Sequence, residues 1–182
     1  MSAPAPRATY RVQLRPGFGF DEAAALAPYL AELGISHLYA SPILQAVPGS
    51  QHGYDVADPT RISHELGGDE GFRRLVEALR SAGLGLLLDI VPNHMSTDAR
   101  VNPWWADVLE AGVDSPWAEF FDIEWDPPQP ELRGRVLLPV LGDSPEVVAR
   151  RGELRLERSE GRVRLAYFDA RIPLAPSSFA GL

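Results

Sequence analysis

Two short polar stretches carry residue types that can do chemistry. The segment LGLLLDIVPNHMS, residues 84–96, begins as an apolar run and ends with Asp89, Asn93 and His94. The segment QHGYD, residues 51–55, adds an imidazole, a phenol and a second carboxylate. Such groups bind hydroxyls, exchange protons or orient a neighbouring acid. What they can do depends on the elements of the chain that position them.

The first half of the sequence alternates strand and helix patterns. The sequence predicts strands over residues 9–14, 36–40 and 84–91 and helices over residues 21–34 and 69–83. Pro28 should kink the first helix or shift its start. We expect a Gly/Pro/Ser-rich loop from Ser41 to Gly68. Strands joined by helical crossovers are parallel, and the unbroken apolarity of 84–91 indicates a strand covered on both faces. The predicted class is α/β, the beginning of a sheet or barrel.

Ligands of parallel α/β folds bind beyond the carboxyl ends of the strands. Gln13 ends the first predicted strand, QHGYD follows the second, and Asp89 follows the third. Taken singly, each residue has an ordinary structural reading. An aspartate caps backbone, Asn and His form turns, and His37 and His64 have no convergent neighbours. The prediction of a site rests on two polar stretches at neighbouring strand ends.

The second half has a different pattern. Its four tryptophans fall within residues 104–125, among several prolines. We predict a strand over 135–141 and a β-hairpin over 152–168 with its turn at Glu160-Gly161. This half reads as a β-rich insertion without a further helix–strand unit. The expected division is a loose N-terminal arm (1–8), three β/α units (9–95) and an inserted domain (96–182).

Composition excludes several classes of partner. The formal net charge is −8 and cysteine is absent. An acidic chain is a poor ligand for nucleic acid or an anionic membrane, whereas a neutral sugar is compatible with it. Without cysteine there are no disulfides or thiolate metal sites. No stretch of the sequence resembles a secretory leader or a membrane span, so we expect a cytoplasmic protein.

The motifs resemble those of a known enzyme family. DIVPNH and HGYD are similar to the loops after strands three and two of the α-amylase superfamily of glycoside hydrolases, whose fold is a TIM (β/α)8 barrel. The phrases TYRVQLRPGFGF, SHLYASPILQAVPGSQHGYDVADPTRI, ELGGDEGF, NPWWADVLE and GRVLLPVLG resemble one branch of it. That branch consists of isomerases, intramolecular transglucosylases that convert the reducing-end α-1,4 linkage of maltooligosaccharides into an α,α-1,1 (trehalose) linkage.

The resemblance implies sugar contacts at five positions. His94 would hydrogen-bond the glucose before the scissile bond, and Tyr54 would stack on that glucose. Asp55 would hold hydroxyls of the terminal sugar. Gln13 and His52 stand where further sugar contacts are common in the family. The implied ligand is therefore a maltooligosaccharide.

Two further roles come from the same resemblance. Asp89 would pair with an arginine beside the nucleophile and orient it. Asn93 would fix its loop, and in many members of the superfamily it also ligates calcium, although the other oxygen ligands of such a site are not recognisable here. We expect no cofactor and no metal centre.

The catalytic carboxylates are not among these motifs. Retaining glycoside chemistry needs two carboxylates roughly 5 Å apart, and the family places its nucleophilic Asp after strand four and its acid Glu after strand five. Asp169 in YFDAR matches neither segment. A full barrel takes about 250 residues. We therefore expect the N-terminal part of a longer enzyme, comprising a partial TIM barrel with strands one to three and an inserted domain B. Alone it should be inactive and prone to aggregate.

The implied transfer reaction requires a pocket that excludes water, and we hypothesise that the Trp/Pro-rich segment 103–130 forms a wall of that pocket.

Three alternatives remain open at this point. One is part of an ordinary α-amylase or α-glucosidase. Another is a non-catalytic carbohydrate-binding half-barrel. The third is a metal-dependent hydrolase that uses Asp89, His94 and His52, although their spacing fits no familiar metal pattern.

Overall fold

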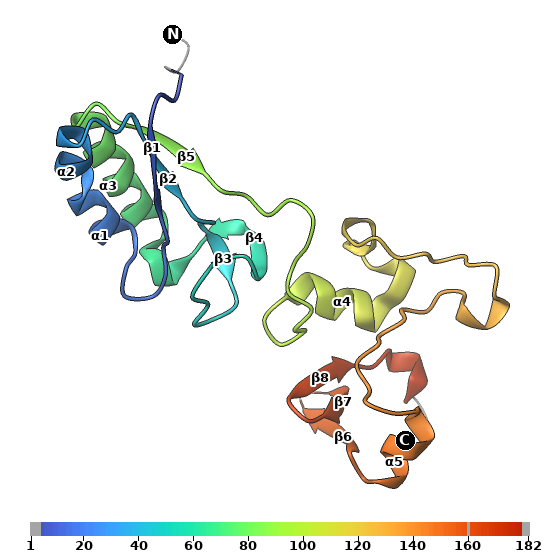
Figure 1. The fold of residues 1–182 in the computed structure, drawn as a ribbon. Helices are drawn as coiled ribbons and strands as arrows, with labels where there is room; N and C mark the ends of the chain where they lie inside the picture. Colours follow the sequence, from blue (N-terminus) through green and yellow to red (C-terminus); the bar gives the residue numbers. More distant parts are fainter. Residues whose placement is uncertain (1–4, 160, 180–182) are drawn as a thin grey trace. The chain divides into compact units, whose positions relative to one another are not determined.

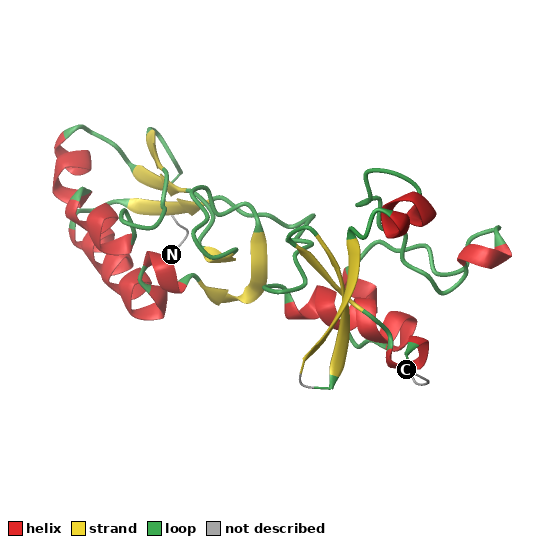
Figure 2. Ribbon diagram, turned by 90° about the horizontal axis from the view of Figure 1, so that it is seen from below, coloured by secondary structure: helices red, strands yellow, loops and turns green. Residues whose placement is uncertain are grey.

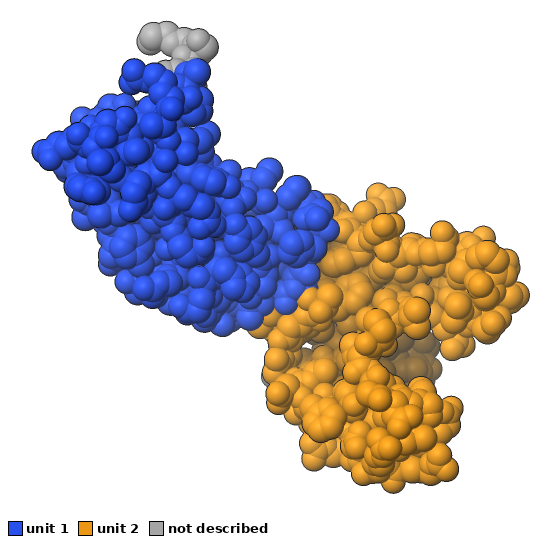
Figure 3. All heavy atoms as spheres, in the orientation of Figure 1, with its two compact units in different colours: residues 1–96 blue, residues 97–182 orange. Residues whose placement is uncertain are grey.

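The computed structural model describes residues 5–159 and 161–179. The chain divides into two compact units, unit 1 from Met1 to Ser96 and unit 2 from Thr97 to Leu182 (Figure 3). Each unit has its own secondary structure.

Unit 1 is built on a parallel sheet. Strands β1 (Thr9–Val12), β2 (His37–Ala40) and β5 (Gly85–Leu88) pair in the order β1-β2-β5 (Figure 1). The register places Tyr39 of β2 beside Leu87 of β5. The three predicted parallel strands are thus confirmed, each shorter than the sequence pattern suggested.

The helices of unit 1 are α1 (Phe20–Ala25), α2 (Ala27–Glu32) and α3 (Gly68–Ser81). The predicted kink at Pro28 is present as a break between α1 and α2. Proline stands in the first turn of α2, where its missing amide hydrogen costs no helical hydrogen bond. A salt bridge with two 2.8 Å hydrogen bonds joins Arg74 of α3 to Asp21 of α1.

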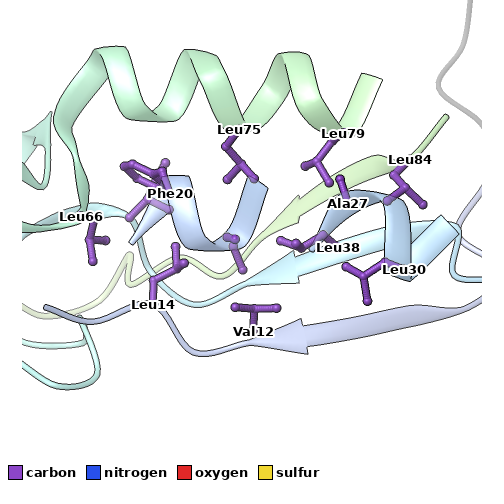
Figure 4. Packing of buried hydrophobic residues seen from close by; sticks show 13 residues of the cluster. Val12, Leu14, Phe20, Ala27, Leu30, Leu38, Leu66, Leu75, Leu79 and Leu84 are labelled. Atoms are coloured by element: carbon purple, nitrogen blue, oxygen red, sulfur yellow. The ribbon is translucent and has the colours of Figure 1, made fainter. Parts of the chain in front are cut away.

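The core of unit 1 lies between these helices and one face of the sheet (Figure 4). Phe20, Leu30, Leu38 and Leu75 are completely buried. Burying side chains of this size contributes about 1.5–3 kcal/mol each. Because alternate residues of a strand face opposite ways, Val12 of β1 faces this core and Arg11 projects from the other face of the sheet.

Strand β5 corrects one expectation. The apolar run predicted a strand covered on both faces, but Leu88 is 40% exposed and Ile90 is 68% exposed. β5 lies at one end of the strand order, and the helices of unit 1 pack on a single face of the sheet (Figure 2). The run is therefore only partly buried within the described residues.

The predicted loop of residues 41–68 contains a hairpin. Strands β3 (Leu44–Ala46) and β4 (Val56–Ile62) pair antiparallel, with register shifts on either side of Gln45, and a 3₁₀ turn follows at His64–Leu66. Sequence reasoning missed it because Pro59 interrupts β4 and the irregular register breaks the alternation that reveals a strand. The hairpin supports the segment that carries Tyr54.

The N-terminal arm was expected to be loose over residues 1–8. Residues 1–4 lie outside the described part of the chain. The backbone amides of Arg7 and Ala8 donate to Ser36 Oγ at 2.9 and 3.0 Å, and that hydroxyl donates to the Ala8 carbonyl. The end of the arm is therefore fastened to the start of β2, which corrects the expectation.

Unit 2 is less β-rich than the sequence suggested. It contains helices α4 (Pro103–Ala111) and α5 (Pro145–Arg150). Asn102 caps α4, since its side-chain oxygen accepts the amides of Trp104 and Trp105 at 3.1 Å. The pair Asn102-Pro103 is the sequence signal for this helix start. Short 3₁₀ turns occupy Gly112–Asp114, Ala118–Phe120, Pro130–Leu132 and Pro176–Ser178.

The strand predicted over 135–141 is absent, because these residues have no regular secondary structure and pair with none of the described strands. Pro139 has no amide to donate, and Leu137 is 81% exposed, so the segment has neither partner nor cover.

The hairpin of residues 152–168 is present as β6 (Leu154–Ser159) and β7 (Arg162–Tyr167). A third strand, β8 (Ala170–Pro173), extends it to an antiparallel sheet in the order β6-β7-β8. Of the predicted turn, Glu160 lies outside the described residues, and Gly161 has a φ of 78°, which glycine adopts without strain.

The tryptophans of unit 2 pack against other aromatic rings. Trp104 stacks on Trp117 with centroids 4.2 Å apart, and Trp105, 7% exposed, lies 5.0 Å from Phe121. These rings stabilise unit 2 itself. Trp105 also borders two hollows of unit 2, and the hypothesis that segment 103–130 forms a wall of the substrate pocket stays a prediction.

Candidate functional site

The polar residues predicted from sequence gather at the carboxyl ends of the unit 1 strands. Gln13 follows β1, the β3–β4 hairpin follows β2, and Asp89 directly follows β5. The Asp89 amide continues the ladder by donating to the Ala40 carbonyl at 2.9 Å. Parallel strands end at one edge of a sheet, so three segments distant in sequence meet there.

Tyr54 and Asp89 are joined directly. The Tyr54 hydroxyl donates to Asp89 Oδ2 at 2.5 Å. Arg11, one residue before the end of β1, donates from Nη2 to the Tyr54 hydroxyl at 3.1 Å. Its Nη2 lies 3.9 Å from Asp89 Oδ2. A cation, a phenol and a carboxylate therefore form one connected group.

The charges of this group change its proton affinities. The hydrogen bond to Asp89 raises the pKa of Tyr54, because the carboxylate is stabilised by the phenol proton. The hydrogen bond from Arg11 opposes this effect. The pKa of Arg11 is raised chiefly by its hydrogen bond to Tyr54. Tyr54 is consequently a neutral hydrogen-bond donor throughout the physiological pH range.

His94 lies against the Tyr54 segment. Its Nε2 is 3.1 Å from the Tyr54 carbonyl oxygen, and its Nδ1 is 3.0 Å from Asn93 Oδ1. Both ring nitrogens therefore have partners inside unit 1. A sugar hydroxyl that bonds to His94 would replace one of these contacts, and Asn93 holds the ring in place from the other side.

His52 and Asp55 flank the tyrosine. The His52 Nδ1 accepts the Tyr54 amide at 3.1 Å and lies 3.7 Å from Asp55 Oδ1. The His52 ring is stacked near Tyr54, with centroids 6.0 Å apart. Ser50 Oγ donates to Asp55 Oδ1 at 2.5 Å. The second oxygen of Asp55 has no hydrogen bond to the described part of the chain, so it is available to a ligand.

Gln13 ties the end of β1 to the hairpin. Its Nε2 donates to the His52 carbonyl at 3.2 Å, and its Oε1 accepts from Arg11 Nη1 at 3.1 Å. All seven residues predicted from sequence therefore belong to one neighbourhood of unit 1. Arg11 and Ser50 were missed. A charged residue in a predicted strand, two positions before Gln13 and so on the same face, was the signal for Arg11.

A local backbone constraint shapes the tyrosine turn. Gly53 has a φ of 77°, and a Cβ at this position would lie 2.9 Å from the Pro42 carbonyl oxygen. Its amide donates to Ser50 Oγ at 3.1 Å. Only glycine satisfies both the positive φ and the close approach.

The arrangement suits recognition of hydroxyl groups. It offers an aromatic ring, carboxylate oxygens, an amide and imidazoles, the groups that bind pyranose faces and hydroxyls. Both carboxylates are engaged by neighbouring side chains. No group of three or more His, Cys, Asp or Glu side chains with metal-binding geometry occurs among the described residues. None of the helices in the described part of the chain is long and apolar enough to cross a bilayer.

Comparison with known proteins places the chain in a family. Residues 25–141 match the family described as "Alpha amylase, catalytic domain", which is more than half of the chain. The chain therefore belongs to the α-amylase family. The matched residues include β2, β5 and the segments that carry Tyr54 and Asp89, whereas β1 precedes them.

Within this family the chain is similar to maltooligosyltrehalose synthases. A putative maltooligosyl trehalose synthase of Mycobacterium tuberculosis H37Rv is 48% identical over 179 residues, which cover 95% of this chain and 22% of the relative. The solved maltooligosyltrehalose synthase from Arthrobacter ramosus superposes with a TM-score of 0.79 at 41% identity and covers 93% of this chain and 21% of that one. The chain thus spans about a fifth of the length of these relatives.

Other members of the family match a shorter stretch. The intracellular maltogenic amylase of Bacillus subtilis is 37% identical over 95 residues, 52% of this chain and 15% of the relative. The synthases are therefore similar over both units, whereas the amylase is similar over about half of the chain.

Proposed function

We propose that this chain is the N-terminal part of an intramolecular transglucosylase that converts the reducing-end α-1,4 linkage of a maltooligosaccharide into an α,α-1,1 linkage. The observation that carries the proposal is the 48% identity to a maltooligosyl trehalose synthase across 95% of the chain. The cluster around Tyr54 and Asp89 supports it, since its chemistry suits a sugar. A cytoplasmic location stays a prediction.

In this proposal unit 1 forms the first three β/α units of a TIM barrel and unit 2 is part of an inserted domain B. The parallel strands β1, β2 and β5 support this assignment, since each connection between consecutive members contains at least one helix. The boundary between the units also supports it, since it follows Ser96, eight residues after the end of β5, the third parallel strand. The site would then lie at the end of the barrel where the family binds its substrates.

We infer a substrate-binding role for the residues at the strand ends. The Tyr54 ring would stack on the glucose before the scissile bond, and His94 would bond one of its hydroxyls. Asp55 would bind hydroxyls through its available oxygen, with His52 and Gln13 nearby. These roles agree with the hydrogen bonds that already fix each side chain.

Asp89 and Asn93 would act as supporting residues. Asp89 follows β5 and accepts the Tyr54 hydroxyl, which holds its carboxylate at the edge of the site. In the assembled enzyme it would also orient the arginine beside the nucleophile. Asn93 would hold His94 through their 3.0 Å contact.

The reaction would proceed by two displacements at one anomeric carbon. A carboxylate nucleophile attacks while an acid protonates the leaving oxygen, which gives a glycosyl-enzyme and a free glucose. The glucose turns within the pocket and loses the proton of its anomeric hydroxyl to the residue that acted as the acid. Its oxygen then attacks the anomeric carbon of the glycosyl-enzyme, which releases the nucleophile and forms the α,α-1,1 bond. Both catalytic carboxylates would come from polypeptide beyond these 182 residues, so this chain alone would be inactive.

A chimeric enzyme tests the proposal. The segment of the Arthrobacter ramosus synthase that matches this chain is replaced by residues 1–182, and products from maltopentaose are analysed. We expect a trehalosyl product, its loss in Asp89→Asn, and its retention in Asp69→Asn, an exposed acid on α3 away from the site.

Two outcomes would contradict the proposal. A folded chimera that releases maltose and glucose without trehalosyl product would favour an ordinary amylase. A folded chimera without any turnover would leave the chain as a binding module at most. If circular dichroism shows that the full graft is unfolded, a graft of residues 1–96 into the same enzyme repeats the test.

A further inference from the structure

Arg11, which was not among the predicted site residues, contacts three of them, Gln13, Tyr54 and Asp89. It lies on β1, opposite Tyr39 of β2 in the parallel register. Both project from the sheet face that is not covered by the helices. The Arg11 guanidinium carbon lies 5.8 Å from the centre of the Tyr39 ring, within the range of a cation–π contact.

The guanidinium reaches both sides of the candidate site. Nη1 donates to Gln13 Oε1 and Nη2 donates to the Tyr54 hydroxyl, each at 3.1 Å. The same Nη2 lies 3.9 Å from Asp89 Oδ2. The side chain is 41% exposed, so it borders the open edge of the sheet and is not part of the core.

We propose that Arg11 is a positioning residue of the glucan site, which fixes the ring of Tyr54 and, through it, the carboxylate of Asp89. This inference rests on the proposed function. It assigns to Arg11 of β1 a positioning role in addition to the sugar contacts proposed for the residues at the strand ends.

The direction of the hydrogen bonds supports this role. A phenol has one hydrogen, and Tyr54 gives it to Asp89. Arg11 has only donors, so its contact with Tyr54 must use a lone pair of the phenol oxygen. Donation therefore runs from Arg11 to Tyr54 and from Tyr54 to Asp89, and this direction cannot reverse while the phenol is neutral. The two hydrogen bonds restrict movement of the Tyr54 ring and of the Asp89 carboxylate.

Lysine would not reproduce this arrangement. The planar guanidinium presents separate N–H groups to Gln13 and Tyr54 while its central carbon lies over the Tyr39 ring. The lysine ammonium is a compact charge whose donors all lie on one nitrogen, and it has no planar surface to stack on a ring. The proposal therefore predicts that shape and charge are both required at position 11.

The competing explanation is a surface ion pair of no consequence, because exposed pairs contribute little stability. The two explanations differ in the proton affinity of Tyr54. The hydrogen bond to Asp89 raises its pKa and the hydrogen bond from Arg11 lowers it. Loss of Arg11 and loss of Asp89 should therefore move the tyrosine titration in opposite directions.

The first experiment uses chain 1–182 with ¹³Cζ-labelled tyrosine, and NMR follows each ring with pH. The Tyr54 signal is identified by its disappearance in Tyr54→Phe. We expect its midpoint to move upward in Arg11→Met and downward in Asp89→Asn. The matched control is Arg15→Met, an exposed arginine four residues further on that contacts the Pro16 carbonyl. An unchanged midpoint in Arg11→Met, or a shift of the same sign as in Asp89→Asn, would refute the coupling.

The second experiment measures kcat/KM for trehalosyl formation in the chimera with the Arthrobacter ramosus synthase. Misplacement of a substrate-binding group by about 1 Å costs as much as 100-fold in rate, so we expect Arg11→Met and Arg11→Lys to lose about 10- to 100-fold. Arg15→Met should keep the parental rate. An active chimera that is indifferent to Arg11→Met, or fully rescued by lysine, would overturn the role of Arg11 alone. If the Tyr54 midpoint shifts as expected in chain 1–182 but the chimera without substitutions forms no trehalosyl product, the proposed function is overturned and the positions of Arg11, Tyr54 and Asp89 are not.

Discussion

The turn that carries Tyr54 should depend on Gly53 more than on any other glycine of its hairpin. Its φ of 77° lies in the left-handed region, and a Cβ would meet the Pro42 carbonyl oxygen at 2.9 Å. Gly49, in the same hairpin, has a φ of 79° with no heavy atom within 4 Å of its would-be Cβ. Gly53→Ala and Gly49→Ala therefore share the backbone strain and differ in the close approach.

The expected magnitudes follow from this difference. Holding an alanine in the left-handed region costs about 1–2 kcal/mol, which is the whole cost for Gly49→Ala. Forcing an extra methyl group against packed backbone adds about 1–3 kcal/mol. Gly53→Ala should thus lower the free energy of unfolding of unit 1 by about 2–5 kcal/mol in total. It should also displace the turn between His52 and Tyr54.

Urea unfolding of chain 1–182 measures the stability change. Circular dichroism at 222 nm follows the helices of unit 1, and tryptophan emission reports directly on unit 2, where all four tryptophans lie within residues 104–125. In the chimera, Gly53→Ala should reduce trehalosyl formation more than Gly49→Ala. The reasoning is refuted if the two variants have equal free energies of unfolding, or if Gly53→Ala keeps the parental rate.

Three further predictions concern single interactions. The hydrogen bond from Arg74 lowers the pKa of Asp21, so its stabilising effect is present above the ordinary value of 3.8 and is lost as pH falls through the folded value; the stability difference between the wild type and Asp21→Asn should vanish in acid unfolding curves. The pKa of Tyr54 is raised by its bond to Asp89, so the stabilisation relative to Tyr54→Phe, about 1 kcal/mol, should be constant below the ordinary value of 10.0 and decline above it; a difference that grows with alkaline pH would contradict this. Trp105→Ala should destabilise unit 2 by about 3–5 kcal/mol, measured by the urea midpoint of tryptophan emission, and an unchanged midpoint would mean that the buried indole is not part of its core.

The sequence predicted much of unit 1 because its signals are local. Apolar residues at helical spacing in residues 69–83 and the apolar run of 84–91 need only their neighbours in sequence to be recognised. The connection rules then made the strands parallel and brought their carboxyl ends to one edge. This is why Tyr54, Asp89 and His94 were expected at a common site although they lie up to 40 positions apart.

Unit 2 was predicted less well for the same reason. Its hairpin has regular alternation and was found, whereas β8 is short and was not. The start of α4 depends on a side-chain cap at Asn102, and the run 135–141 has strand-like residues without a strand to pair with. In such segments the outcome is set by partners far along the chain, which the local pattern does not contain.

The sequence by itself therefore determined the helices and the three parallel strands of unit 1 and the residue types at the strand ends, but not the β3–β4 hairpin. Only the tertiary structure decided which of those side chains bond to one another. Arg11 and Tyr54 are separated by 43 positions, and their contact exists because parallel pairing fixes β1 beside β2 and the irregular hairpin returns the Tyr54 turn to the same edge. A hydrogen bond needs donor and acceptor within a few tenths of an ångström, and folding of the chain in three dimensions is what sets that distance.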